Sequence, residues 1–480
     1  MSLPGQYIEL IAGALDEPAV VLDGRLEDSD DGSLLGPQRA SADGAVQDAL
    51  ATAHAAWAGG SWSGLELEDR ADALERLAAE LDRRAETIAL LDAVDSGVPL
   101  AVTAAIAGSL GDLVRSVVVR ARVIGDVRAL DAGGRRVEVL RLPWGPALLL
   151  TPFNAPAPTA VGKLANALAA GCPAILKPSE HAPSSAGQIA EAAVAAELPP
   201  GALQIVHGGA DVARQLVADP RVRVISLTGG QAAGRSIAAA AAPRMAALQL
   251  ELGGSNPSVV TDDADVIGTA AALAAGMTKL NGQWCEAPRR VLVDRRRHDD
   301  LVDALREALA AIRIGPARAP DTELGPLSHR AQRDSVRRQV AMLGGEAIPT
   351  APVPDGPGLF ESPTLVTGLA ADAVDEEIFG PVLTLHPIEG DTAAIAAANA
   401  TGDGLAAYVF AGGLDRAFDI GRSLHAGEVR IGGTHLLDLA PGSTQSFWGS
   451  SGIGAHGDAE VFEAYRGSRI VGEEDPGLPI

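Results

Sequence analysis

The chain has 480 residues, 62 acidic side chains against 38 basic ones, and a formal net charge of −24 at pH 7. This charge argues against binding to nucleic acids or anionic membranes, because both need clustered Lys and Arg to neutralise phosphates. Two cysteines exclude a disulfide framework or a Cys-rich zinc site, and 47% hydrophobic residues are typical of a globular protein. No secretory signal is visible, and we expect a cytoplasmic protein.

The N-terminal part of the chain is expected to be helical before a hairpin. Residues 44–121 are rich in Ala, Leu, Glu and Arg at helical spacing. Residues 122–141 hold two alternating apolar runs on either side of a Gly-rich turn at 131–134. That pattern predicts a β-hairpin.

From residue 146 to 254, short apolar runs alternate with Ala-rich helical stretches. This alternation predicts a doubly wound parallel sheet, which binds ligands where loops leave the carboxyl ends of the strands. The predicted strands are Ala147–Thr151, Ala174–Lys177, Leu203–His207, Val222–Thr228 and Ala247–Leu252. A second α/β lobe follows, with predicted strands Pro257–Val260, Arg290–Val293, Leu365–Val366, Val382–Pro387, Ala406–Phe410 and Val429–Ile431.

The two cysteines lie in different sequence surroundings. Cys172 precedes an apolar strand, which favours a small buried residue. Cys285 ends the Gly-containing loop 281–285, where no periodic pattern explains it as core. A lone cysteine in an intracellular enzyme is a candidate nucleophile if a neighbour lowers its pKa or accepts its proton.

Two polar side chains could act together with that thiol. Asn154 follows a strand in a proline-locked loop, where its amide could donate to a developing oxyanion. An isolated Asn in such a loop more often caps its own turn. Glu251 lies in an apolar strand that leads into a Gly pair and could be a general base. Taken alone, it is better explained by a salt bridge to one of the many arginines.

Two segments at predicted strand ends could bind a dinucleotide. Lys177 and Glu180 follow one strand, and both side chains could hydrogen-bond ribose hydroxyls. Another segment runs from strand to helix through Gly229, Gly230 and Gly234, which would let backbone amides approach a pyrophosphate. It is not the Gly-x-Gly-x-x-Gly fingerprint and is weak by itself.

Lysine is rare in this chain. Only three of the 38 basic residues are Lys, at positions 163, 177 and 279. Each could serve chemistry that Arg cannot perform. Codon bias, with three lysines retained by chance, explains any one of them equally well.

Taken in order and spacing, these residues resemble the NAD(P)-dependent aldehyde dehydrogenase superfamily over about residues 40–470. The most diagnostic segments are Leu-Lys-Pro-Ser-Glu at 176–180, Glu-Leu-Gly-Gly at 251–254 and Glu-Ile-Phe-Gly-Pro at 377–381. The resemblance implies an α/β fold with a doubly wound Rossmann-type cofactor domain, an α/β catalytic domain and a β-hairpin oligomerisation arm. The implied ranges are 1–121 with 142–253 for NAD binding, 254–445 for catalysis, and 122–141 with 446–480 for the arm and C-terminal segment.

The resemblance also implies a role for each site residue. Cys285 would attack the aldehyde, Asn154 would hold the oxyanion, and Glu251 would activate the water that hydrolyses the thioester to the acid. No metal is implied. The implied cofactor-binding residues are Thr151, Pro152, Phe153, Lys177, Ser179, Glu180, Gly229, Gly230, Gly234, Leu252, Gly253, Glu377 and Phe379. The Glu180 carboxylate would repel a 2′-phosphate, which favours NAD over NADP.

The partners implied are a small aldehyde and further copies of the chain. An exposed hairpin needs a partner edge, so we expect a homodimer or homotetramer. Four aromatic residues fall in segments that this fold would bring near the sulfur: Phe153, Trp284, Phe447 and Trp448. They favour aromatic or medium apolar aldehydes over small polar semialdehydes.

The sequence departs from the family pattern at several places, two of which bear most directly on the nucleophile and the substrate. Glu286 directly follows the candidate nucleophile, and we expect it to face outward because an inward carboxylate would raise the thiol pKa. Residues 446–449 replace a common Pro-Phe-Gly-Gly stretch, so relatives do not reveal the substrate.

Three other functions are alternatives to hydrolytic aldehyde oxidation. Acyl transfer to coenzyme A stays open, although Glu251 argues against it because a general base for water is what a hydrolytic enzyme needs. A non-catalytic cofactor-binding protein also stays open as an alternative, although the joint presence of Asn154, Glu251 and Cys285 argues against it. A papain-like thiol hydrolase would need a His base, and none of the nine histidines has a suitable context.

Overall fold

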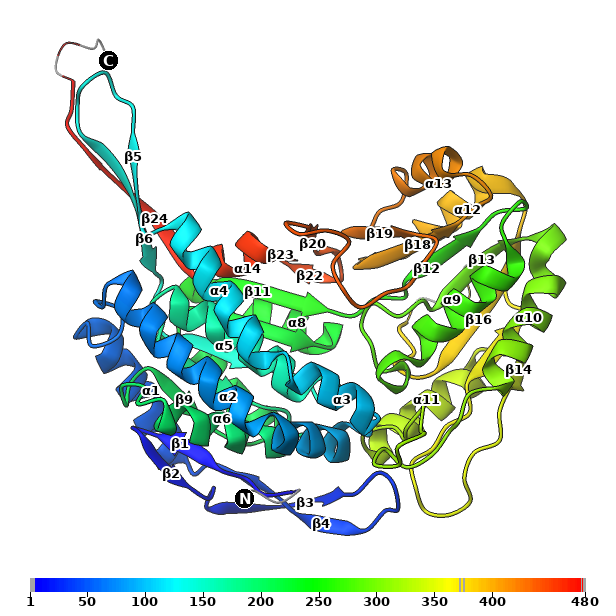
Figure 1. Ribbon diagram of the computed structural model, residues 1–480, viewed down its shortest axis with the longest axis horizontal. Helices are drawn as coiled ribbons and strands as arrows, with labels where there is room; N and C mark the ends of the chain where they lie inside the picture. The colour runs from blue at the N-terminus through cyan, green and yellow to red at the C-terminus, as the bar shows by residue number, and fades with distance from the viewer. Residues whose placement is uncertain (1–4, 371–372, 374–375, 476, 478–480) are drawn as a thin grey trace.

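Five parallel strands form the centre of an eight-stranded sheet (Figure 1). The computed structural model describes residues 5–370, 373, 376–475 and 477. In spatial order the five strands are β9 (Leu203–Ile205), β8 (Ala174–Lys177), β7 (Ala147–Leu150), β10 (Val224–Gly229) and β11 (Ala247–Leu252). The edges are β1 (Glu9–Ile11) with β2 (Ala14–Asp16), and β22 (Gly452–Ile453). The predicted doubly wound sheet is therefore confirmed.

Helices cover both faces of this sheet because its strands are apolar on both sides. In β7, Ala147 and Leu149 pack into one core and Leu148 and Leu150 into another, as the two-residue period of a strand requires. One face is covered by α2 (Leu67–Ser96), α4 (Leu110–Ile124), α5 (Pro156–Ala169) and α6 (Ser184–Ala195). The other is covered by α1 (Asp43–Ala58), α7 (Ala210–Ala218) and α8 (Gln231–Ala241).

One helical span is apolar enough to be compared with a membrane-spanning helix. By length and composition, Leu100–Ile124 could cross a membrane. It comprises α3 (Leu100–Ala107) and α4, which lie beside α2 and α5 in Figure 1. Val114, Val117 and Val118 of α4 are buried in the core that these helices share, so its apolar face has a partner within the protein.

A seven-stranded sheet forms the second lobe. Its order is β14 (Glu346–Pro349), β15 (Thr364–Thr367), β16 (Val382–Ile388), β13 (Arg290–Asp294), β12 (Pro257–Val260), β18 (Ala406–Phe410) and β19 (Glu428–Ile431). All six predicted strands of this lobe are present. Helices α9 (Val266–Thr278) and α10 (His298–Ala310) cover one face, while α12 (Gly390–Ala398) and α13 (Leu414–Gly421) cover the other.

The predicted hairpin projects away from the two lobes (Figure 1). It consists of β5 (Val127–Leu130) and β6 (Val137–Pro143), and β24 (Arg466–Gly472) pairs with β6 to make a three-stranded sheet. The predicted start at residue 122 is wrong, because residues 122–124 continue the helical period of α4. The N-terminal hairpin of β3 (Val20–Glu27) and β4 (Leu34–Ala40) was not predicted.

One further α-helix of the second lobe and several short elements, most of them in the C-terminal segment, complete the fold. They are α11 (Arg330–Met342), β17 (Asp403–Gly404), β20 (Thr444–Ser446), β21 (Trp448–Gly449), β23 (Ala455–Gly457) and α14 (Asp458–Glu463). The implied domain boundaries stay a prediction. The parts of those ranges at residues 1–4, 371–372, 374–375, 476 and 478–480 lie outside the described residues.

Candidate active site

The nucleophile loop leaves α9 through two residues with left-handed backbone. Leu280 has φ 49° and Asn281 has φ 60°, values that cost energy for residues other than Gly. The Asn281 side chain donates to Pro326 O and accepts from Gly325 N, each at 2.8 Å. These bonds hold the strained turn in place, and the turn sets the path of the chain toward Cys285.

Arg289 and Gly282 fix the loop onto the 377–381 segment. Arg289 is buried and donates to Gly380 O at 2.7 Å, to Gly282 O at 2.8 Å and to Trp284 O at 3.0 Å. Gly282 has φ 74°, and a Cβ there would collide with Gly380 and Pro381. The nucleophile loop and the diagnostic segment 377–381 thus form one packed unit.

The candidate thiol and the candidate base are in contact. Cys285 is half-buried, and its Sγ donates to Glu251 Oε1 at 3.4 Å. Thr228 lies opposite Glu251 in the β10–β11 register, and its hydroxyl donates to Glu251 Oε2 at 3.0 Å. Asn256 Nδ2 donates to the Cys285 carbonyl at 2.8 Å, which fixes the backbone at the nucleophile. The carboxylate is therefore placed to accept the thiol proton.

Electrostatics around the sulfur favour the neutral thiol. Burial raises the pKa of the Cys285 thiol well above its ordinary value, and the nearby Glu251, Glu286 and Glu377 carboxylates raise it further. A thiol in this environment needs a proton acceptor before it can attack. The contact with Glu251 supplies one.

The Asn154 amide lies beside the nucleophile loop. Its side chain is buried, and Nδ2 donates to Gln283 O, two residues before Cys285, at 2.7 Å. An amide nitrogen carries two hydrogens, so a second N–H is left for another acceptor. Sequence reasoning did not identify Gln283, whose own amide donates to Ser96 O at 3.3 Å.

A cavity of about 630 Å³ opens at the carboxyl ends of β7, β8 and β10. This is where the strand order reverses, since the chain runs outward from β7 to β9 and returns beside β7 as β10. Eight of the thirteen residues predicted to bind the cofactor line it: Thr151, Pro152, Phe153, Lys177, Ser179, Glu180, Gly229 and Gly230. Among the described residues, no group of His, Cys, Asp and Glu side chains could hold a metal ion.

Two of the predicted cofactor residues, Thr151 in the lining of the cavity and Glu377 outside it, carry enclosed polar atoms. Glu377 Oε1 and Thr151 Oγ1 are enclosed and have no hydrogen-bond partner within the described part of the chain. Burial raises the pKa of Glu377 to about 7, although Arg289 opposes this from 4.0 Å. A Cβ at Gly253 would collide with the Glu377 carboxylate. Such atoms are costly unless a ligand satisfies them, and ribose hydroxyls would.

Five of the predicted cofactor residues do not line the cavity: Gly234, Leu252, Gly253, Glu377 and Phe379. A Cβ at Gly234 would collide with the Leu252 side chain, so this Gly lets α8 pack against β11. Phe379 is close to the cavity, with its ring 5.9 Å from the ring of Phe153.

The four aromatic residues expected near the sulfur have different surroundings. Phe153 lines the cofactor cavity and packs edge-on against His329, with ring centroids 4.8 Å apart. Trp448 is 46% exposed and lies near His425, and Phe447 is buried beside Gly452. Of the four aromatic residues, only Trp284 packs in a cluster with Cys285.

Glu286 does not face outward as expected. It is half-buried, and burial raises the pKa of its carboxyl to about 7, with further increases from Glu428 and Glu251. Its backbone carbonyl accepts a hydrogen bond from the Tyr408 hydroxyl. The prediction failed because this carboxyl packs against the C-terminal segment, where Gln445 hydrogen-bonds it.

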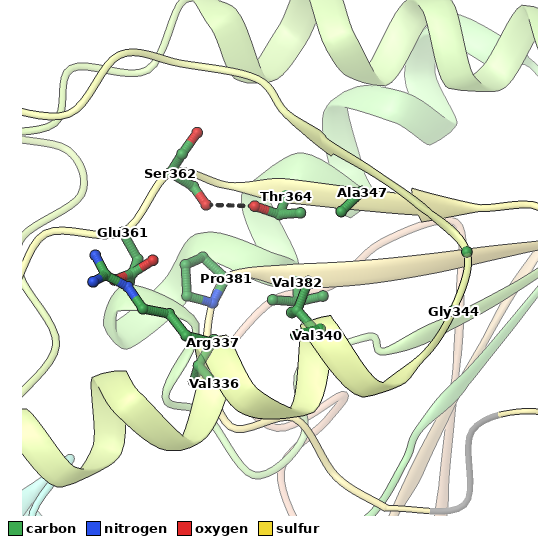
Figure 2. A pocket seen from close by; sticks show the side chains of 12 residues that line it. Val336, Arg337, Val340, Gly344, Ala347, Glu361, Ser362, Thr364, Pro381 and Val382 are labelled. Atoms are coloured by element: carbon green, nitrogen blue, oxygen red, sulfur yellow. Dashed lines mark hydrogen bonds and ion pairs between the residues drawn. The ribbon is translucent and has the colours of Figure 1, made fainter.

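A second cavity, of about 340 Å³, lies beside α11 (Figure 2). Arg337 and Glu361 form an ion pair there at 2.6 Å, and none of the predicted site residues lines it. Elsewhere on α11, the side-chain amides of Gln332 and Gln339 donate to Phe379 O at 2.6 Å and to Glu377 O at 3.1 Å. This helix therefore supports the cofactor loop.

The fold and this arrangement define a class of protein: an oxidoreductase with a dinucleotide cavity and a cysteine beside it. Residues 27–471 match the family model of the aldehyde dehydrogenase family, and the chain belongs to that family. It is an aldehyde dehydrogenase that uses NAD(P).

Several relatives show how varied this family is. The chain is 33% identical to a putative 4-(hydroxymethyl)benzenesulfonate dehydrogenase of Comamonas testosteroni, over 85% of this chain and 86% of that one. It is also 33% identical to geranial dehydrogenase of Castellaniella defragrans, over 88% and 89%. The crystal structure of betaine aldehyde dehydrogenase from Staphylococcus aureus with NAD+ matches with a TM-score of 0.91 at 26% identity, over 99% and 96%.

Proposed function

We propose that this protein oxidises an aldehyde to the carboxylic acid with NAD, through a covalent intermediate on Cys285. The observation that supports this most directly is the contact of 3.4 Å between Cys285 Sγ and Glu251 Oε1. Thr228 lines the cofactor cavity and holds the same carboxylate, so the thiol and base lie beside the cavity.

The chemistry follows from these positions. Glu251 accepts the thiol proton as sulfur attacks the aldehyde carbon, and the resulting oxyanion accepts hydrogen bonds from the Cys285 backbone N–H and the second N–H of Asn154. Bound NAD would supply the acceptor for the hydride, and loss of that hydride leaves a thioester on Cys285. Glu251 passes that first proton to solvent and then takes a proton from water, whose oxygen attacks the thioester; the C–S bond breaks, the acid leaves, and Glu251 returns the proton to the Cys285 sulfur.

The preference for NAD rests on Glu180. Its carboxylate lines the cavity, and Oε2 lies 3.8 Å from the ammonium of Lys177. Burial lowers the pKa of Lys177, whose Nζ also donates to Pro178 O and Gly208 O at 2.7 and 2.6 Å. A carboxylate held in this way would accept hydrogen bonds from ribose hydroxyls and repel a 2′-phosphate.

We also propose a cytoplasmic homodimer or homotetramer that acts on aldehydes with an apolar or aromatic stem. Val98, Leu280 and Trp284 form an apolar wall against Cys285, which suits such a stem. Both cysteines are free, as a reducing compartment maintains them. The exposed arm supports assembly.

Replacing each cysteine in turn tests the proposed nucleophile. Cys285→Ala should reduce turnover to less than about one thousandth of wild type while NAD still binds, as followed by fluorescence titration. Cys172→Ala is the matched control, because that thiol is buried against Tyr465 O at 3.2 Å, outside the site, and should keep its activity. Substantial turnover by Cys285→Ala would place the nucleophile elsewhere.

A further inference from the structure

The three lysines differ in how their ammonium groups are satisfied. Lys163 is buried and donates to Ser226 Oγ at 2.8 Å and Gln249 Oε1 at 3.2 Å. Lys177 has two carbonyl acceptors and a carboxylate. Among the residues that the structure describes, Lys279 has no hydrogen-bond acceptor and no carboxylate within ion-pairing distance. Its Nζ lies instead 4.8 Å above the centre of the Trp284 ring.

Lys279 lies beside the apolar wall that borders the nucleophile. It follows α9 directly and precedes Leu280, which packs with Val98 and Trp284 in the cluster that includes Cys285. The cofactor cavity is lined by residues after β7, β8 and β10 and includes none of this cluster. An aldehyde whose carbonyl reaches the sulfur would therefore have its stem along the wall and its far end toward Lys279.

A third cavity borders the same apolar wall, because Leu280 belongs to both. A cavity of about 490 Å³ is lined by Lys279 and Leu280 together with Pro99, Val102 and Leu436. Its other charged lining residue, Glu323, is paired with Arg313 at 3.3 Å. Within the described part of the chain, the Lys279 ammonium is the charge in this lining that has no ion-pair partner.

The surrounding charges leave that ammonium available to an anion. Burial and the nearby Arg430 lower the pKa of Lys279 to about 8, so it is still mostly protonated at neutral pH, while Glu286 acts in the opposite direction. Arg430 is itself bonded to Glu428 at 2.6 Å. Glu286 has a pKa of about 7 and is only partly ionised. A half-buried cation over a ring gains more from a ligand carboxylate than from water.

We propose that Lys279 is a specificity-determining residue that binds an anionic group at the far end of the aldehyde substrate. The substrate class is then an aldehyde with an apolar or aromatic stem and a distal carboxylate or similar anion. This inference rests on the proposed function and names the substrate of the same site. A lysine suits the position because its flexible four-carbon stem lets the ammonium move from the ring to a ligand anion.

The test compares two aldehydes of similar shape and different charge. The ratio of kcat/KM for 4-formylbenzoate to that for 4-methylbenzaldehyde should exceed one in the wild-type enzyme. Lys279→Met should lower that ratio by roughly 10- to 100-fold, because the distal carboxylate loses a charged hydrogen-bond donor. Lys279→Arg should recover part of it. An unchanged ratio in Lys279→Met would overturn the assignment.

A cation on the same part of the surface gives the matched control. Arg306 is exposed on α10, two residues from Ala308, which lines the cavity, and so it points to the opposite side of that helix. Arg306→Met should leave the ratio unchanged, and an equal loss would mean that long-range charge accounts for the preference.

Inhibition of the wild-type enzyme provides a second measurement that needs no variant. Terephthalate should inhibit at least tenfold more strongly than 4-methylbenzoate, and equal inhibition would overturn the role of Lys279. Oxidation of both aldehydes without a charge preference would refute this inference and leave the proposed function standing. If the enzyme bound NAD but oxidised neither of the two aldehydes, both this inference and the proposed function would be wrong.

Discussion

At the scale of single residues, the unusual feature is a nucleophile surrounded by negative charge. Reactive cysteines usually lie near cations or helix N-termini that lower the thiol pKa. Here burial and the Glu251, Glu286 and Glu377 carboxylates raise it. The cofactor-free site therefore holds a protected thiol, and its attack depends on proton transfer to Glu251.

This electrostatic arrangement predicts an unusual effect of Glu251→Gln on thiol alkylation. Iodoacetamide reacts with the thiolate, so in the cofactor-free Cys172→Ala background the rate should be low at pH 7 and still rise above pH 9. Glu251→Gln removes a charge and an acceptor that raise the Cys285 pKa, so the alkylation rate at pH 8 should increase several-fold. A wild-type midpoint below about pH 8.5, the ordinary thiol value, would contradict the assignment.

The same variant should lose the second half of the reaction. Without a base for water, Glu251→Gln with aldehyde and NAD should accumulate the thioester on Cys285, visible by intact mass. The wild-type enzyme under the same conditions is the control and should show no adduct at steady state. If Glu251→Gln turns over slowly without an acyl-enzyme, another group activates the water.

The Glu180 carboxylate leads to a prediction about cofactor choice. Glu180→Ser should raise the NADP-to-NAD ratio of kcat/KM by about tenfold or more, because it removes the repulsion of a 2′-phosphate. Arg214 lines the same cavity and would then face that phosphate. Glu191→Ser is a control, since this acidic residue lies on α6 outside the cavity and should leave the ratio unchanged. An unchanged ratio in Glu180→Ser would show that another residue decides cofactor choice.

At the scale of elements, the decisive piece is the turn between α9 and Cys285. Leu280 and Asn281 adopt left-handed backbone, and Gly282 lies against Gly380 and Pro381. Arg289 donates hydrogen bonds to the carbonyl oxygens of Gly282 and Gly380, on the two sides of this contact. The nucleophile loop and the cofactor loop are therefore positioned together, and a shift in one moves the other.

The Gly282 contact can be tested against a glycine of similar backbone conformation. Gly344 has φ 77°, close to the 74° of Gly282, but a Cβ there would meet nothing within 4 Å. Gly344→Ala should cost only the backbone term of about 1 kcal/mol and keep activity. Gly282→Ala adds a collision with the 380–381 backbone and should reduce kcat at least tenfold, with a lower melting temperature. Equal behaviour of the two variants would mean that the contact is unimportant.

The sequence predicted the elements better than the contacts between them. The strand that carries Glu251 was predicted with its observed bounds, because alternating apolar residues that end at a glycine pair have a clear local pattern. The packing role of Gly234 and the clamp formed by Arg289 depend on residues distant in sequence, so no local pattern could reveal them. The inward position of Glu286 was missed because it depends on the C-terminal segment folding back over the site.

At the scale of the whole molecule, the two lobes and the C-terminal segment meet at Glu251. The β22 strand pairs with β11, with Gly452 opposite Glu251, so the returning chain adds an edge to the cofactor sheet beside the base. From there it continues through α14 into β24, the third strand of the arm. The arm is thus connected directly to the catalytic centre by the segment between Gly452 and Arg466.

The projecting arm, made of strands β5, β6 and β24, leads to a prediction about the oligomeric state. Val127, Ile470 and Val471 are more than half exposed on its sheet, whose outer strands β5 and β24 have unpaired edges. Such surfaces are unstable in water without a partner. Light scattering should therefore give a mass of at least twice the 48.8 kDa of one chain, and Ile470→Arg should shift it toward one chain. Met342→Arg, at a position 83% exposed on α11, is the control and should keep the wild-type mass, whereas a monomeric wild-type protein would refute the role of the arm.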